Sequence, residues 1–147
     1  MVVPNMTVPR ITHIALHVDR LEACIDFYQR YCGMQICHRR QSGDKAIVWM
    51  AEPGREGDFI FVMMNGGHNL PLPNNDYRHF GFAVESREAV DRIALRAEAE
   101  GCLLWEPRDE AFPVGYYCGL VDPSGNQVEF SYGQPLGPGA EQWQQLT

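Results

Sequence analysis

Two short stretches decide the fold of this chain: residues 12–18, THIALHV, and residues 78–84, RHFGFAV. Both are rich in β-branched, aliphatic or aromatic residues, so each one predicts a strand. The second residue of each stretch is a histidine, so His13 in the first matches His79 in the second. The sequence therefore indicates one unit that occurs twice, with a histidine at the same point of each copy.

Each copy continues with the same elements. A stripe of apolar residues at helical spacing follows each of the two stretches and ends at Gly33 or Gly101, as a left-handed helix cap would require. Asp19 with Glu22, and Ser86 in the second copy, are typical of residues that cap a helix start. Three further strands are expected in each copy, at about 34–40, 45–51 and 58–64, and at about 102–106, 115–121 and 127–132.

The predicted fold is therefore α+β, with two tandem βαβββ modules. We expect a single domain over residues 10–135, with module 1 at about 10–65, a linker at 66–76 and module 2 at about 77–132. Residues 1–9 and 136–147 are expected to be tails. The linker and the second tail are rich in Gly, Pro and polar residues.

Composition excludes several functions. The 147 residues carry a net charge of −7 and no run of basic residues, which argues against nucleic-acid and anionic-membrane partners. No apolar stretch is long enough to span a membrane, and the start does not resemble a secretory signal. The five cysteines show no C-x-x-C spacing, so we expect reduced thiols in a cytoplasmic protein.

A metal site is the main chemical prediction. His13 and His79 stand in equivalent strands, among small neighbours that leave open space. Glu129 stands in the middle of a strand, where an unpaired carboxylate is costly to bury. These three side chains would satisfy one another around one divalent cation, as in sites with two histidines and one carboxylate. The alternative is three side chains that are satisfied separately.

A substrate pocket is expected beside this site. If the spacing between Gly33 and Gly101 continues along the chain, Phe61 matches Glu129, so an apolar residue stands where a fourth ligand would be. Phe59, Phe61 and Met63 should share one face of a strand and form an apolar wall, although core packing explains them equally well. Trp49 is expected to add aromatic surface.

Three other groups have open roles. His17 shares the face of His13 and is a candidate acid or base, or else a histidine of the rim or core. Trp105 and Tyr117 are candidates for the same aromatic surface, and Tyr117 also for a catalytic role. The pair Arg39 and Arg40 either recruits an acid group or is solvated surface charge.

The chain resembles the vicinal-oxygen-chelate superfamily, which includes glyoxalase I, extradiol dioxygenases, fosfomycin-resistance transferases and bleomycin-resistance proteins. The resemblance rests on residues 11–13 (ITH), on 27–28 (FY) followed by Gly33, and on 122–129 (DPSGNQVE). It implies a half-open mixed-sheet barrel around one metal, which holds two adjacent oxygens of a small-molecule substrate. It also implies a homodimer, and leaves open whether modules pair within one chain or across two chains.

Departures from the subfamilies narrow the reaction. Phe61 stands where glyoxalase I has a carboxylate, Ala15 where fosfomycin transferases have a threonine, and Gly119 where extradiol dioxygenases have a tyrosine. The ligand set still makes extradiol-type oxygen chemistry with Fe2+ the first expectation. A non-oxidative glyoxalase, lyase or thiol-transferase with Mn2+, Zn2+ or Ni2+ is the alternative, and a bleomycin-resistance-like binding protein without turnover is the other.

Overall fold

The computed structural model describes residues 8–67 and 72–137. It contains two helices and two four-stranded sheets, as predicted for two βαβββ units. The elements of the first unit are β1 (His13–His17), α1 (Leu21–Cys32), β2 (Gln35–Ser42), β3 (Lys45–Ala51) and β4 (Ile60–Met64). Those of the second are β5 (Phe80–Ala83), α2 (Arg87–Glu100), β6 (Leu103–Glu110), β7 (Gly115–Val121) and β8 (Gln127–Tyr132).

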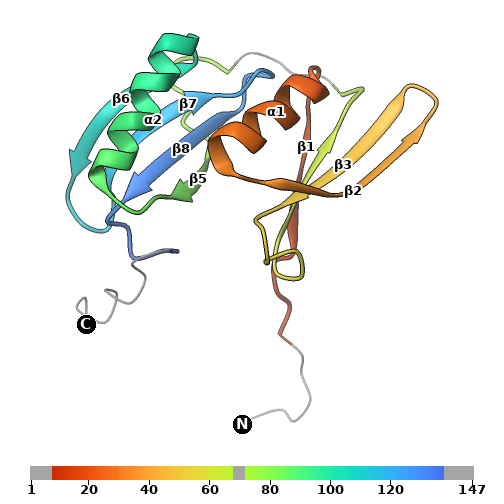
Figure 1. Cartoon of the computed structure of the whole chain (residues 1–147), viewed down its shortest axis with the longest axis horizontal. Coiled ribbons are helices and arrows are strands. Elements are labelled where there is room, and N and C mark those ends of the chain that lie inside the picture. The colour runs from red at the N-terminus through yellow and green to blue at the C-terminus, as the bar shows by residue number, and fades with distance from the viewer. Residues whose placement is uncertain (1–7, 68–71, 138–147) are drawn as a thin grey trace.

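The two sheets have the same strand order and remain separate. The first sheet runs β1-β4-β3-β2 and the second runs β5-β8-β7-β6. In each, the first strand is parallel to its neighbour and the other pairs are antiparallel. Strands β1 and β5 are therefore both edge strands, and Figure 1 shows them as separate edges.

Glycine ends both helices, as expected from the sequence. Gly33 and Gly101 adopt positive φ angles of 64° and 76°, which a side chain would disfavour, and their N–H groups close the last helical turn. The Ser86 hydroxyl caps α2 by accepting from the Ala89 N–H at 3.0 Å, also as predicted.

The expected cap at Asp19 and Glu22 is wrong. The N-cap of α1 is Arg20, which makes no side-chain cap, although its own N–H donates to the Ser124 hydroxyl at 3.2 Å. Glu22 instead forms an ion pair with Arg39 of β2. A turn of the second module thus takes part in holding the start of this helix.

The two modules share one core in which α1 is central. In Figure 1, α1 lies between the sheets, while α2 covers the second sheet. The buried Tyr28 ring lies 5.0 Å from Phe61 of the first sheet, and its hydroxyl donates to Asp122 of the second module at 2.7 Å. Asp122 also accepts from the Ser124 and Asn126 N–H groups, so the DPSGN turn is built around this carboxylate.

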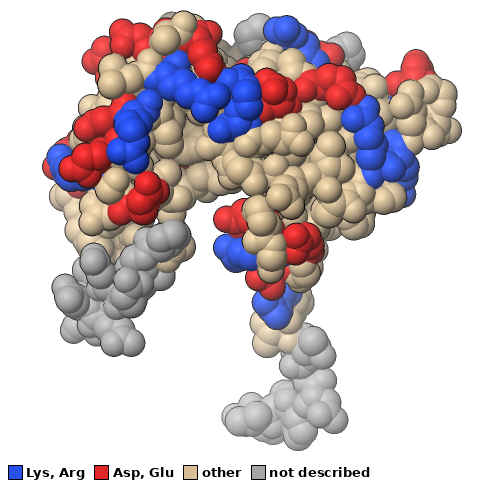
Figure 2. Space-filling view, viewed as in Figure 1, with Lys and Arg blue, Asp and Glu red and all other residues tan. Residues whose placement is uncertain are grey.

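The outer side of the helices carries mixed charge, with Lys and Arg side chains beside Asp and Glu in Figure 2. Arg30 of α1 and Arg96 of α2 both bind Glu100, at 3.0 and 3.1 Å.

Neither described helix is long and apolar enough to cross a membrane.

Candidate metal centre and cavity

His79 and Glu129 lie together on the second sheet. His79 directly precedes β5, and its Nε2 lies 3.1 Å from Oε2 of Glu129 in β8. Val128 and Phe130 are buried in the core, so alternation along the strand turns Glu129 to the opposite face. There its carboxylate is still largely shielded, with a side-chain exposure of 10%.

The hydrogen bonds around this pair call for a cation. Nδ1 of His79 lies 2.6 Å from the Tyr77 carbonyl oxygen, so Nδ1 carries the proton and donates it. In the neutral ring, Nε2 then points a lone pair at the carboxylate, which is also an acceptor. Two acceptors 3.1 Å apart need a positive charge between them, either a second ring proton or a metal ion.

The donor spacing suits a metal ion. Nitrogen and oxygen ligands at about 2.1 Å from an ion, at right angles to each other, are about 3.0 Å apart. The outer hydrogen bonds are also of the kind found around metal ligands, because Gln134 Nε2 donates to Oε1 of Glu129 at 3.0 Å. His79 and Glu129 therefore fit half of a divalent-metal site.

His13 does not join this pair within one chain. It lies on β1 at the edge of the first sheet, with Nδ1 2.9 Å from the Thr12 hydroxyl. In the part of the chain that the structure describes, no three His, Cys, Asp or Glu side chains are close enough to hold one ion. The expected meeting of His13 with His79 across one cleft is absent from the single chain, because β1 and β5 belong to separate sheets.

The register of the sheets corrects the expected match between Phe61 and Glu129. Ala15 lies opposite Val62, and Gly81 lies opposite Glu129. Ala15 and Gly81 occupy the same place in the two copies, two positions after His13 and His79, so the counterpart of Glu129 is Val62. The position of a fourth ligand is still apolar, but a valine occupies it.

This shift of one position also changes which side chains form the pocket. Phe61 and Met63 are buried in the core on the helix side of β4, and Phe59 lies before the strand, outside the cavity lining. A slip of one position exchanges the two faces of a strand. Of the four residues expected to line a pocket, only Trp49 does so.

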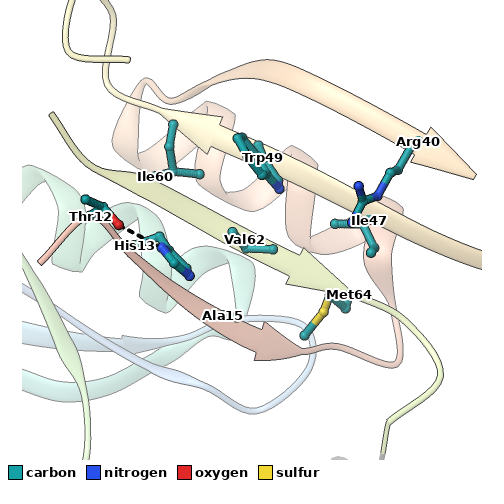
Figure 3. A pocket seen from close by; sticks show the side chains of 9 residues that line it. All are labelled: Thr12, His13, Ala15, Arg40, Ile47, Trp49, Ile60, Val62 and Met64. Atoms are coloured by element: carbon teal, nitrogen blue, oxygen red, sulfur yellow. Dashed lines mark hydrogen bonds between the residues drawn. The ribbon is translucent and has the colours of Figure 1, made fainter. Parts of the chain in front are cut away.

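The open face of the first sheet carries a cavity of about 350 Å³, which we call the sheet-1 cavity. Figure 3 shows its lining, with His13 and Arg40 at opposite ends of an apolar floor. Its residues are Thr12, His13, Ala15, Arg40, Ile47, Trp49, Ile60, Val62 and Met64. The sequence alone allows two roles for Arg40, solvated surface charge or recognition of an acid group. Strand alternation cannot decide between these roles, because it does not show which face of the sheet is open.

Trp105 fills the space beside His79. Gly119 lies opposite Glu129 on β7, and a Cβ atom built on it would lie only 2.2 Å from the Trp105 indole. The same indole meets the His79 ring edge-on, with ring centres 5.6 Å apart. The missing tyrosine at position 119 is therefore replaced by an indole wall, a link that sequence spacing does not reveal.

The two candidate acid–base residues have defined surroundings. Tyr117 shares the face of Gly119, and its hydroxyl donates to Glu110 at 3.0 Å. Burial, followed by this hydrogen bond, raises the pKa of Tyr117, so the phenol stays protonated at neutral pH. His17 ends β1, and its ring packs against Gly67, where a Cβ atom would lie 2.0 Å from the ring.

Comparison with known sequences finds one family. The model of the Glyoxalase/Bleomycin resistance protein/Dioxygenase superfamily matches residues 10–130. The uncharacterized protein PA2024 of Pseudomonas aeruginosa is 65% identical over 133 residues, which cover 90% of this chain and 95% of that protein. A probable trivalent organoarsenical cleaving enzyme of Bacillus subtilis is 29% identical over 125 residues, covering 84% and 80%.

Solved structures share the fold at lower identity. A glyoxylase/bleomycin resistance protein/dioxygenase domain from Frankia sp. EAN1pec has a TM-score of 0.67 at 18% identity, covering 87% of this chain and all of that domain. A mutant of the fosfomycin resistance protein FosX from Listeria monocytogenes, with Mn(II) and a dihydroxypropylphosphonic acid, has a TM-score of 0.65 at 20% identity. The shared part covers 85% of this chain and 93% of that one.

Proposed function

Because the chain belongs to the Glyoxalase/Bleomycin resistance protein/Dioxygenase superfamily, we propose that it is a divalent-metal-dependent enzyme acting on a small molecule. The observation that carries the proposal is the approach of His79 Nε2 to Glu129 Oε2 at 3.1 Å, while Nδ1 of the same ring lies 2.6 Å from the Tyr77 carbonyl oxygen. A bound metal would hold two neighbouring oxygens of the substrate and stabilise negative charge that develops on them.

The third ligand in this proposal is His13 of a second copy of the chain. Support comes from the edges. Among the described residues, β1 and β5 each have no neighbouring strand on one side, and an unpaired edge is a ready surface for a second chain. A twofold pairing that sets β1 of one copy beside β5 of the other brings His13 to His79 and Glu129 twice. The active form is then a homodimer with two metal sites.

Three neighbours would hold these ligands in place. The Tyr77 carbonyl fixes the tautomer of His79, and Gln134 orients the carboxylate of Glu129. The Trp105 indole packs against His79 and keeps water from that side of the ring. Tyr117, whose hydroxyl donates to Glu110 at 3.0 Å, is a candidate catalytic residue in this proposal, and His17 is the candidate acid or base.

The donor set points first to oxygen chemistry. Two histidines and one carboxylate leave positions open for both a substrate and dioxygen, as at non-haem Fe2+ sites. Extradiol-type ring cleavage with Fe2+ is therefore the first reaction to test. The specific observation in favour of a non-oxidative reaction, with Mn2+, Zn2+ or Ni2+, is Gly119, since Trp105 leaves no room there for a tyrosine.

The activity named for the Bacillus subtilis relative finds little support in the cavity. Trivalent arsenic binds thiols strongly, and no cysteine of the described residues lines the sheet-1 cavity. Cys24 and Cys118 are buried in the core, where burial raises the pKa of Cys24 to about 11 and that of Cys118 to about 12. Both thiols therefore stay protonated and turned away from the open face.

Metal content of purified variants tests the proposal. We expect one divalent ion per chain in the wild type and loss of most of it in His13→Ala, His79→Ala and Glu129→Gln. His38→Ala is the matched control, because His38 is exposed and contacts Trp49 rather than the proposed ligands. Full occupancy in both His79→Ala and Glu129→Gln would refute the site.

Oxygen uptake decides between the reactions. After anaerobic loading with Fe2+, a catechol panel should consume oxygen if ring cleavage is correct. Reaction only with dicarbonyls or with thiol and electrophile pairs would select the non-oxidative alternative. Binding without turnover in every panel would instead favour a protein that sequesters its ligand.

A further inference from the structure

We propose that the sheet-1 cavity holds the apolar body of an elongated organic acid, and that Arg40 binds the acid group. The inference extends the proposed function by naming a substrate class. It rests on that function only for the end of the molecule near His13.

The cavity is apolar except at its ends. Ala15, Ile47, Trp49, Ile60, Val62 and Met64 form its floor and sides. Thr12 and His13 lie at one end, and Arg40 lies at the other (Figure 3). An apolar cavity with a few polar groups at fixed points is typical of small-molecule sites, in which the polar groups set orientation.

Arg40 is the one lasting positive charge among the described residues of this lining, which include no carboxylate. It forms no ion pair with any residue that the structure describes. The chain has a net charge of −7, which disfavours the binding of anions in general. The unpaired guanidinium of Arg40 therefore provides a local positive site for an anion beside the apolar cavity. A planar fork of N–H donors matches a carboxylate better than a neutral group.

Arg39 shows that the two neighbours have different roles. Successive side chains on a strand point to opposite faces. Arg39 therefore points to the helix side, where it forms an ion pair with Glu22 of α1. Arg40 points to the cavity. The first arginine joins β2 to a helix, and the second is left for a ligand.

The register of the sheet requires an elongated molecule. His13 lies opposite Ile60, and Arg40 lies opposite Ile47, which is paired with Met64. The backbone positions of His13 and Arg40 are thus four residues apart along the strands, or about 13 Å, and three strand spacings apart across them, or about 14 Å. A molecule that touches both ends needs an apolar body between its acid group and its pair of oxygens, and Trp49 lies beside that body.

Calorimetry with a graded series of ligands tests the inference on the full-length protein. The probes are benzoic, 3-phenylpropanoic and 5-phenylpentanoic acids, each compared with its primary amide. We expect the longer acids to bind the wild type about tenfold more tightly than their amides, since the acid gains charge-assisted hydrogen bonds. Arg40→Gln should remove this difference, whereas the control Arg39→Gln should keep it.

A charge reversal makes the test sharper. Arg40→Glu should reverse the preference, so that a phenylalkylamine binds better than the acid of equal length. Equal binding of acids and amides to the wild type, or no binding of any acid, would overturn the inference. So would an Arg40→Gln variant that weakens the dimer but leaves acid binding unchanged, because Arg40 would then contact the second copy.

Metal content separates this inference from the proposed function. Arg40→Gln should retain the metal content of the wild type, because Arg40 is no ligand. If acid recognition depends on Arg40 while His79→Ala and Glu129→Gln keep all their metal, the cavity inference stands and the metal site fails. If instead acid binding does not depend on Arg40, while His79→Ala and Glu129→Gln lose their metal, the proposed substrate class fails and the metal site stands.

Discussion

Gly119 and Trp105 form a tight side-chain contact beside the proposed metal site. Adding one methyl group at Gly119 would place a carbon 2.2 Å from the indole, so the ring would have to move. Because the same ring packs on His79, we expect Gly119→Ala to lower the free energy of unfolding by about 1–3 kcal/mol and to weaken metal binding. Urea unfolding followed by tryptophan fluorescence measures the first effect, and metal titration the second.

Gly57→Ala is the matched control for this prediction. Nothing lies within 4 Å of a Cβ atom at Gly57, and its backbone does not have a positive φ angle. Its stability should therefore stay within about 0.5 kcal/mol of the wild type. Equal unfolding curves for the two variants would show that Trp105 is not held against position 119.

Among the secondary-structure elements, Glu100 links the end of α2 to α1. It accepts hydrogen bonds from Tyr31, Arg30 and Arg96, and these contacts, that from Tyr31 first, lower the pKa of its carboxyl to about 2 from an ordinary value of 4.5. The unfolded chain binds this proton at higher pH than the folded chain does. The stability from Glu100 is therefore present above pH 4.5 and is lost as the pH falls toward 2.

We expect Glu100→Gln to lower the Tm at neutral pH. The difference in Tm between the variant and the wild type should then shrink as the pH falls from 4.5 to 2. Calorimetric melting over this range measures it. Glu98→Gln provides the control, since Glu98 is on the same helix and exposed, and it should leave Tm nearly unchanged at each pH. A gap that stays constant down to pH 2 would contradict the linkage.

The strands and helix ends were largely predictable from the sequence, since alternation, Gly33, Gly101 and Ser86 act locally. The N-terminal cap of α1 was not predictable, because the Ser124 hydroxyl of the other module accepts a hydrogen bond from the Arg20 N–H at that end of the helix. The prediction of which β4 side chains face the cavity was also wrong. The spacing between the two helix-capping glycines does not continue unchanged into the last strand of each module, where the register makes Val62 rather than its neighbour the counterpart of Glu129.

The candidate site was predictable only in part for a similar reason. The mid-strand position of Glu129 and the repeat position of His79 indicated a polar pair, and the structure places these two side chains together. Whether His13 meets them depends on how the sheets are arranged. Neither periodicity nor spacing carries that information. They also do not show which face of the first sheet is open, so the position of Arg40 in the cavity lining could not be predicted from them.

For the whole molecule, the central claim is that each metal site takes His13 from one chain and His79 with Glu129 from another. The separate sheets and their unpaired edges at β1 and β5 support this arrangement over one closed within a chain. Two inactive variants, each broken in a different half of the site, should restore intact sites when their chains are combined in one dimer.

The measurement is the metal content of mixed dimers, formed by expressing His13→Ala and Glu129→Gln chains together. Each mixed dimer has one intact site, made from the His13 of the Glu129→Gln chain and from His79 and Glu129 of the His13→Ala chain. With random pairing, about one site in four should hold metal, although each variant alone holds almost none. A mixture that binds no more metal than the separate variants would contradict a site shared between two chains.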